Sequence, residues 1–188
     1  GQPMTAINTF RPRLNRAAML LVSTAAILLF AAPKAGAWDE TVGDFTVSRE
    51  RSSYSYGDVT VSAYNGNDTD ITFPTKVTYN GTEYDITAIG SNVLKKFAGV
   101  EGTDIIVTIP EGYTNISGNA FTNCYGLKSI TIPSSITKIN YNAFENCKNL
   151  ADVTFADSNS NLSFGNNVFL NCTSLNNLTL PTRLNDLG

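Results

Sequence analysis

An internal repeat in the second half of the chain constrains its fold more than any other feature of the sequence. The triplet Thr108-Ile109-Pro110 returns as Thr131-Ile132-Pro133. The hexapeptide pattern Asn-(Ala/Val)-Phe-x-Asn-Cys starts at Asn119, Asn142 and Asn167, and a leucine follows each cysteine by three residues. The period is 23 residues and then 25. Motifs that recur in phase over such a period identify an array of small supersecondary units.

Each unit is predicted to open with a short strand. In residues 129–132, Ile130 and Ile132 alternate with polar neighbours, so they point inward while Thr131 faces solvent. Pro133 ends the strand, because proline has no N–H to donate to a neighbouring strand.

The rest of the unit is predicted to be a second alternating strand over residues 136–139 and a single helical turn over residues 142–147. The turn places Phe144 and Cys147 on one side. One unit cannot bury its apolar side alone, whereas stacked units bury a continuous core. The sequence therefore predicts a solenoid.

These residues resemble the BspA-like leucine-rich repeats of bacterial surface proteins. Residues 127–147 follow that family's pattern, from Leu-x-x-Ile-x-Ile-Pro to Ala-Phe-x-x-Cys, nearly position for position. Residues 71–90 resemble the opening repeat with its extra hairpin, and residues 45–64 resemble the strand pair that caps such arrays. The resemblance implies a leucine-rich-repeat solenoid of four to five repeats with an N-terminal β cap.

The expected domains are a signal peptide over residues 1–37, the N-terminal β cap over 38–70 and the repeats over 71–188. The chain departs from the family pattern at Val93-Leu94, which replaces Ala-Phe, at residues 95–104, which lack Cys-x-x-Leu, and at Ala156, which replaces proline. The last repeat stops at Gly188 without a polar capping unit. We therefore expect a truncated array whose isolated end self-associates.

The first 37 residues have the three parts of a secretory signal peptide. A basic stretch over residues 11–16 precedes an apolar run over residues 17–32, and Ala35-Gly36-Ala37 is a small-x-small cleavage site before Trp38. The run is short for a membrane span, although an uncleaved N-terminal anchor is the alternative interpretation. We expect a Sec-type signal, a secreted or cell-surface protein, and no membrane span after cleavage.

The composition after the leader argues against several classes of function. Sixteen acidic and nine basic residues follow Ala37, and this net charge of −7 disfavours nucleic acid and anionic membranes as partners. The chain has no histidine, the commonest general base and metal ligand. It also lacks a Gly-x-Ser-x-Gly motif, a phosphate-binding glycine motif and an evident pair of catalytic carboxylates. We expect no enzymatic activity and no cofactor.

Three polar motifs admit both a ligand-binding and a structural interpretation. Cys124, Cys147 and Cys172 share one repeat position without histidine or Cys-x-x-Cys partners, which favours a ladder of buried side chains and leaves a disulfide open. Residues 65–70 have carboxylates at alternate positions, but Lys76 stands where an EF-hand calcium loop needs glutamate, so a polar turn is favoured. No metal site is expected. The asparagines that follow each phenylalanine, Asn123, Asn146 and Asn171, are expected to cap turns.

The candidate binding surface is the outward side of the first strand of each repeat. One outward position is always threonine and the other varies, with neighbouring rungs about 4.8 Å apart if the coils stack as strands do. The candidate residues are Asp70, Thr72, Ile106, Thr108, Ser129, Thr131, Asp152, Thr154, Asn177 and Thr179. Repeat arrays bind along such extended surfaces, but threonine also simply suits a solvated strand. Both interpretations stay open.

The family resemblance implies adhesion, with an extracellular protein of the host matrix or of another cell surface as partner. A structural spacer that presents another domain is one alternative. Another is a surface that binds a glycan or a crystalline surface through the threonine column. Glycan sites usually expose aromatic side chains, and this column has none.

Overall fold

The computed structural model describes residues 37–51 and 56–187, so residues 1–36 of the predicted signal peptide lie outside the described residues. The described elements, in chain order, are β1 (Trp38–Val42), β2 (Phe45–Arg51), β3 (Tyr56–Tyr64), β4 (Asp70–Thr72), β5 (Lys76–Tyr79), β6 (Thr82–Asp85), β7 (Ala88–Ile89), the 3-10 helix η1 (Lys95–Phe97), β8 (Ile105–Thr108), β9 (Asn115–Ile116), β10 (Leu127–Ile132), β11 (Lys138–Ile139), β12 (Asp152–Phe155), β13 (Leu162–Phe164) and β14 (Leu184–Asp186).

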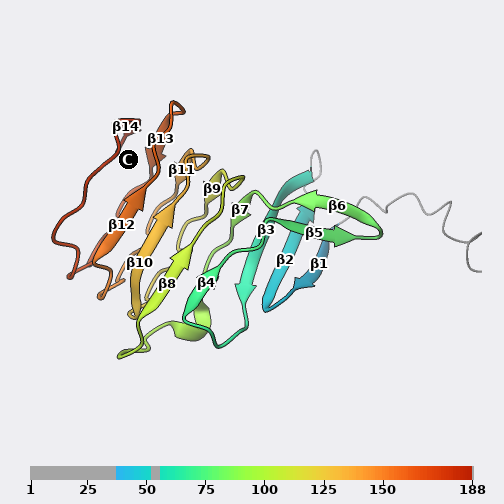
Figure 1. Cartoon of the computed structure of the whole chain (residues 1–188), viewed down its shortest axis with the longest axis horizontal. Coiled ribbons are helices and arrows are strands. Elements are labelled where there is room, and N and C mark those ends of the chain that lie inside the picture. Colours follow the sequence, from blue (N-terminus) through green and yellow to red (C-terminus); the bar gives the residue numbers. More distant parts are fainter. Residues whose placement is uncertain (1–36, 52–55, 188) are drawn as a thin grey trace, which may run out of the picture. The chain divides into compact units, whose positions relative to one another are not determined.

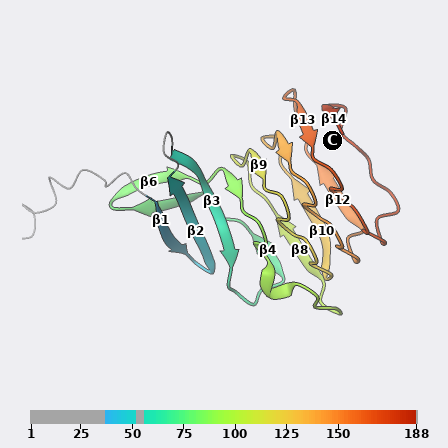
Figure 2. The same ribbon diagram turned by 180° about the vertical axis from the view of Figure 1, so that it is seen from behind.

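The repeats form a β-solenoid with almost no helix, as the sequence predicts. Four successive coils each contribute one strand to a sheet with the order β12-β10-β8-β4 and one to a longer sheet with the order β1-β2-β3-β7-β9-β11-β13-β14, in which β14 has no counterpart in the shorter sheet. The strands of successive coils pair in parallel, which Figures 1 and 2 show from opposite sides. The apolar residues of both sheets point into one continuous core.

The predicted N-terminal cap is three antiparallel strands that extend the longer sheet. β1 pairs with β2 and β2 with β3, and β3 then pairs in parallel with β7 of the first coil. The extra hairpin β5–β6 packs against this cap, because the ring of Trp38 stacks on Tyr79 at 4.9 Å and lies 5.6 Å from Tyr84 between centroids.

Aromatic rings run along the interior from coil to coil. Phe121 and Phe144 are stacked with centroids 5.2 Å apart, and Phe144 and Phe169 are stacked at 5.3 Å. Toward the cap, the ring of Phe73 meets Phe121 edge to face at 6.3 Å. Because the Asn-x-Phe motif recurs in three successive coils, each of them after the first places its ring over the previous one.

The expected helical turn over residues 142–147 is instead a run of tight turns. Asn142 and Asn146 have φ of +53° and +58°, a left-handed conformation that asparagine tolerates better than most residues and that a right-handed helical turn excludes. The turn still buries Phe144 and Cys147 as predicted. Its backbone also bonds to the next coil, since the N–H of Phe144 donates to the carbonyl of Val168 at 2.9 Å.

The first repeat fills its missing Cys-x-x-Leu position in another way. Val93 and Leu94 occupy the positions that Ala120 and Phe121 have in the next repeat, and they are buried as those residues are. The helix η1 follows them and buries Phe97, whose ring stacks on Tyr64 of the cap at 6.3 Å. The departure from the pattern therefore joins the first coil to the cap.

The carboxylate of Glu111 joins two neighbouring coils, at the turns that connect the two strands of each coil. Glu111 accepts hydrogen bonds from the backbone N–H groups of Ser134 and Ser135, at 2.9 and 3.0 Å, and from the hydroxyl of Ser134 at 2.8 Å. Burial opposes ionisation of this carboxyl, but the serine hydrogen bonds outweigh that effect and lower its pKa.

Replacement of Phe144 by alanine should lower the free energy of unfolding by about 3–5 kcal/mol, because the ring is fully buried and stacks on both sides. Urea denaturation followed by circular dichroism measures the change. Leu170→Ala, at a position of the next turn that is 42% exposed, is the matched control and should shift stability by about 0.5 kcal/mol or less. Equal losses in the two variants would contradict the buried aromatic stack.

Candidate functional site

The β4–β8–β10–β12 sheet presents most of the predicted binding face. Its strands are parallel and in register, so the outward side chains form two columns across the sheet. One column is Thr72, Thr108, Thr131 and Thr154, and the other is Asp70, Ile106, Ser129 and Asp152. The inward residues between them are apolar and are packed in the core. The two-residue periodicity of the repeat thus fixes which side chains face solvent.

The structure does not bring Asn177 and Thr179 together with the other eight candidates. Residues 175–181 form no strand, so β12 is the last strand of the described sheet. In this segment Leu180 is 43% exposed, whereas Ile132, its counterpart in the repeat on β10, is fully buried. Leu180 therefore does not pack into the core, as it would have to do in a fifth strand of this sheet.

The face is mainly polar, with one exposed aliphatic side chain at its centre. Ile106 is 43% exposed between the carboxylate of Asp70 and the hydroxyl of Ser129 in its column. Beside the column, Lys128 occupies an irregularity in the β10 pairing, and its ammonium lies 2.6 Å from the carboxylate of Asp104. That hydrogen bond raises the pKa of Lys128, which stays charged.

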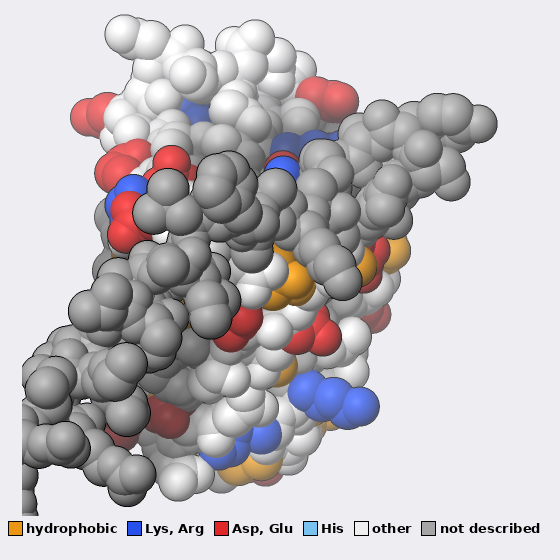
Figure 3. Space-filling model, turned by 90° about the vertical axis from the view of Figure 1, so that its right-hand side faces the viewer, with side chains coloured by type: hydrophobic (Ala, Val, Ile, Leu, Met, Phe, Trp, Pro, Cys, Tyr) orange, Lys and Arg blue, Asp and Glu red, His pale blue; other side chains and the backbone are white. Residues whose placement is uncertain are grey.

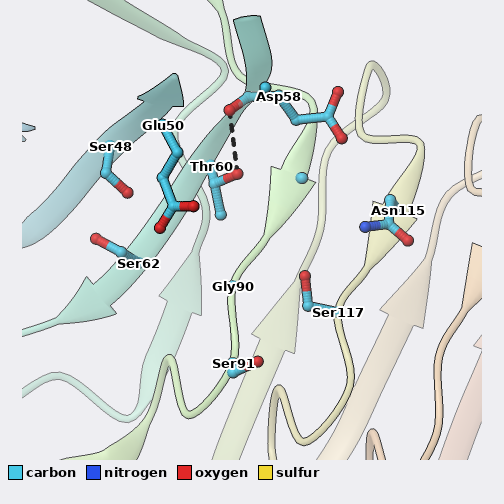
Figure 4. Close-up of a pocket in the computed structure, with 11 residues that line it drawn as sticks. Ser48, Glu50, Asp58, Thr60, Ser62, Gly90, Ser91, Asn115 and Ser117 are labelled. Carbon is cyan, nitrogen blue, oxygen red and sulfur yellow. Dashed lines mark hydrogen bonds between the residues drawn. The ribbon is translucent and has the colours of Figure 1, made fainter. Parts of the chain in front are cut away.

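A polar trough on the other sheet was not predicted from the sequence. Its cavity of about 430 Å³ lies over the outward side of β3, β7 and β9, and Figure 4 shows its side chains. Glu50 of β2 and Asp58 of β3 lie on the cap side and Asn115 of β9 on the repeat side. Between β3 and β9, β7 contributes the small residue Ala88, and Gly90 follows that strand. A Cβ at Gly90 would lie 3.0 Å from the carbonyl oxygen of Val61, so close strand packing explains this glycine.

The trough can offer hydroxyl and carboxylate groups to a ligand. Serine and threonine side chains line it, including Thr60, whose hydroxyl donates to the carbonyl of Asp58 at 3.3 Å. Its residues come from separate repeats and from the cap. The one sequence signal for it is the small outward residues of the second strand, Ala88 and Gly90.

The loop considered for calcium holds a lysine ammonium. Lys96 donates to the backbone carbonyls of Asn65 and Gly66 and to the side-chain oxygen of Asn67, the last at 2.9 Å. The hydroxyl of Tyr64 accepts from the N–H of Asp68 at 3.0 Å and closes the turn. In the part of the chain that the structure describes, no three His, Cys, Asp or Glu side chains cluster as a metal site would require.

The asparagines after each phenylalanine form a ladder between coils. The amide of Asn146 donates to the side-chain oxygen of Asn123, and that of Asn171 to the oxygen of Asn146, both at 2.8 Å. All three residues have positive φ. The sequence predicts that their side chains cap turns, whereas the structure shows them bonding from one coil to the next.

The cysteines form the predicted ladder of packed side chains, and all three are free thiols. The thiol of Cys147 donates to the carbonyl of Phe121 at 3.2 Å, and that of Cys172 to the carbonyl of Phe144 at 3.1 Å. Burial raises the pKa of Cys124 to about 12 and that of Cys172 to about 11, and it raises the pKa of Cys147 as well. Thiols that ionise so poorly are weak nucleophiles.

The comparisons with known proteins agree with this architecture. Residues 87–188 match the BspA type leucine rich repeat region in six copies. A leucine rich cell surface protein from Faecalibacterium prausnitzii A2-165 is 29% identical, with a TM-score of 0.55 over 78% of this chain and 44% of that one. A leucine-rich repeat protein from Bacteroides ovatus is 25% identical, with a TM-score of 0.62 over 80% of this chain and 37% of that one.

A shorter relative is matched over nearly its whole length. The leucine-rich repeat protein from Bacteroides capillosus is 26% identical, with a TM-score of 0.57 over 80% of this chain and 99% of that one. The chain spans less than half the length of the first two proteins. No curated protein matches the sequence. A search of the described residues for a long apolar helix able to cross a membrane finds none.

Thiol labelling should distinguish the free-thiol ladder from a disulfide. At about pH 8 in the folded protein, a thiol reagent should modify Cys172 slowly and leave Cys124 and Cys147 unmodified, because the buried thiols are protonated and inaccessible. In denaturant without reductant, all three thiols should react. A single reactive thiol in denaturant would instead reveal a disulfide between two of them.

Proposed function

Because the chain belongs to the BspA type leucine rich repeat family, we propose that it is a binding module that attaches to an extracellular protein through the outward face of the β4–β8–β10–β12 sheet. The observation that carries the proposal is the in-register alignment of eight exposed or half-exposed positions on four strands. Repeat proteins characteristically bind along such extended surfaces.

The chemistry of the face suits a protein partner. Ile106 supplies an apolar contact near the centre, and the threonine column supplies hydroxyls that both donate and accept hydrogen bonds. Asp70 and Asp152 add negative charge at the two edge strands. An apolar centre with a polar surround is the usual anatomy of a protein–protein interface, and the charges favour a partner with basic residues.

Adhesion at a cell surface is the biological role that we propose for this binding. The signal-peptide pattern in residues 1–37 and the likeness to a leucine rich cell surface protein support secretion or surface display. A non-enzymatic role is part of the proposal. It rests on the absence of histidine from the whole sequence and on the poor ionisation of the cysteines.

Two other functions remain as alternatives. A structural spacer would need the same solenoid but no specific face. A glycan-binding surface would use the threonine column, but no aromatic side chain stands in either outward column of the sheet, and this favours the protein partner.

The triple variant Thr108→Glu, Thr131→Glu, Thr154→Glu should abolish binding to the extracellular matrix protein that the wild type recognises. The three carboxylates would stand side by side in the middle of the face, and we expect an affinity loss of about 100-fold. Surface plasmon resonance against a panel of matrix proteins measures it, with circular dichroism as the test of folding.

A matched control places the same change beside the other sheet. Thr87, Thr114 and Thr137 occupy one position in three successive repeats, and the hydroxyls of Thr114 and Thr137 bond to the coil before. Their replacement by glutamate should leave binding intact. Equal loss in both triple variants would argue for a general charge effect and against this face, and absence of binding by the wild type would favour the spacer.

A further inference from the structure

The outer edge of β4 has backbone groups available for another strand. β8 is the one strand that pairs with β4 among those the structure describes. The carbonyl of Thr69 accepts a hydrogen bond from β8 at 2.7 Å, and the N–H of Phe73 donates to β8 at 3.1 Å. Because backbone groups alternate between the two sides of a strand, the N–H and C=O of Asp70 and Thr72 point away from β8.

The two sheets end differently at this side of the solenoid. β4 and β7 belong to the same coil, and the longer sheet continues past β7 through β3, β2 and β1. The sheet of β4 does not continue beyond β4 among the described strands. One sheet thus has three cap strands beyond the first coil, whereas the position of the next strand beside β4 is vacant among the described strands.

A groove lies at this position. Its volume is about 320 Å³, and it runs between β4 and the turn that joins β1 to β2. Val42 and Pro74 contribute half-buried apolar side chains to it, and its lining also includes Phe45 and Ile71, whose side chains belong to the core. The groove therefore combines an open strand edge with an apolar wall, which are the two features that bind a peptide by strand addition.

The charge of the groove is negative. Asp44, Asp68 and Asp70 line it, and among the residues that the structure describes no lysine or arginine does. Figure 3 shows the side of the molecule that carries the cap, where acidic, basic and apolar side chains lie close together. A ligand that complements this charge is basic.

We infer that the groove binds an extended basic peptide of a partner protein, which pairs with β4 as an additional strand. The peptide backbone bonds to Asp70 and Thr72, one set of alternate side chains packs toward Val42 and Pro74, and the other set carries the positive charges toward the carboxylates. This site uses the edge of the sheet and not its in-register columns, although Asp70 and Thr72 belong to both the groove and the outward face.

Fluorescence anisotropy with the full chain and a labelled pentapeptide, lysine-valine-lysine-valine-lysine, tests the inference. Two further peptides are N-methylated at the valines or at the lysines. Since alternate amides of an added strand point toward β4, one methylated peptide should lose binding and the other should keep it. A peptide with glutamate in place of lysine should bind at least about tenfold more weakly.

Variants of the groove locate the site. Thr72→Pro removes the outward N–H of Thr72, and proline is tolerated there because β4 is an edge strand. This variant should weaken binding about tenfold. Asp70→Asn should weaken it about threefold, with the difference vanishing at high salt. Asp157→Asn, at an exposed position of the loop that follows β12 and outside both the groove and the outward face, is the matched control and should bind as the wild type does.

Three results, all obtained on the unmodified protein, would overturn the inference. They are no saturable binding of the unmethylated peptide, equal binding of both methylated peptides, and equal binding of the lysine and glutamate peptides. A loss caused by Asp157→Asn as large as that caused by Asp70→Asn would also overturn it, because the peptide would then respond to the overall negative charge and not to the groove.

Discussion

Contact between neighbouring coils is the interaction on which the rest of this structure depends. A single coil has two very short strands and a run of tight turns, and none of these buries an apolar side alone. Stacking supplies parallel strand pairing in both sheets, the rings of Phe121, Phe144 and Phe169 in contact, and the asparagine ladder at the turns. Each contribution joins one coil to the next, so stability is a sum over nearest neighbours.

The same stacking creates the surfaces that can bind. Because coils are in register, one outward position of the repeat becomes a column, and Thr108 lies directly beside Thr131. The cap interrupts this regularity: it extends one sheet by three strands and leaves the edge of β4 open. The uniform face and the interrupted edge are therefore two consequences of one architecture, and they offer two different kinds of contact to a partner.

The sequence predicts the features that depend on periodicity, and it fails where contacts between different repeats decide. The inward direction of Ile130 and the burial of Phe144 follow from the alternation and the repeat. The left-handed conformation of Asn146 does not, since its recurrence in each unit also suited a capped helical turn. Two other features depend on how the cap meets the first coils, and the repeat has no pattern that predicts them. They are the hydrogen bonds from Lys96 to the loop at residues 65–67 and the trough over β3, β7 and β9.

A double-mutant cycle on the ring stack tests nearest-neighbour stabilisation most directly. Phe121→Leu and Phe144→Leu, singly and together, should show a coupling of about 0.5–1.5 kcal/mol in the free energy of unfolding, because their rings are in direct contact. Phe121 and Phe169 lie two coils apart, and the same cycle on this pair should give a coupling of about 0.3 kcal/mol or less. Absence of coupling between Phe121 and Phe144, or equal coupling in both pairs, would contradict the account.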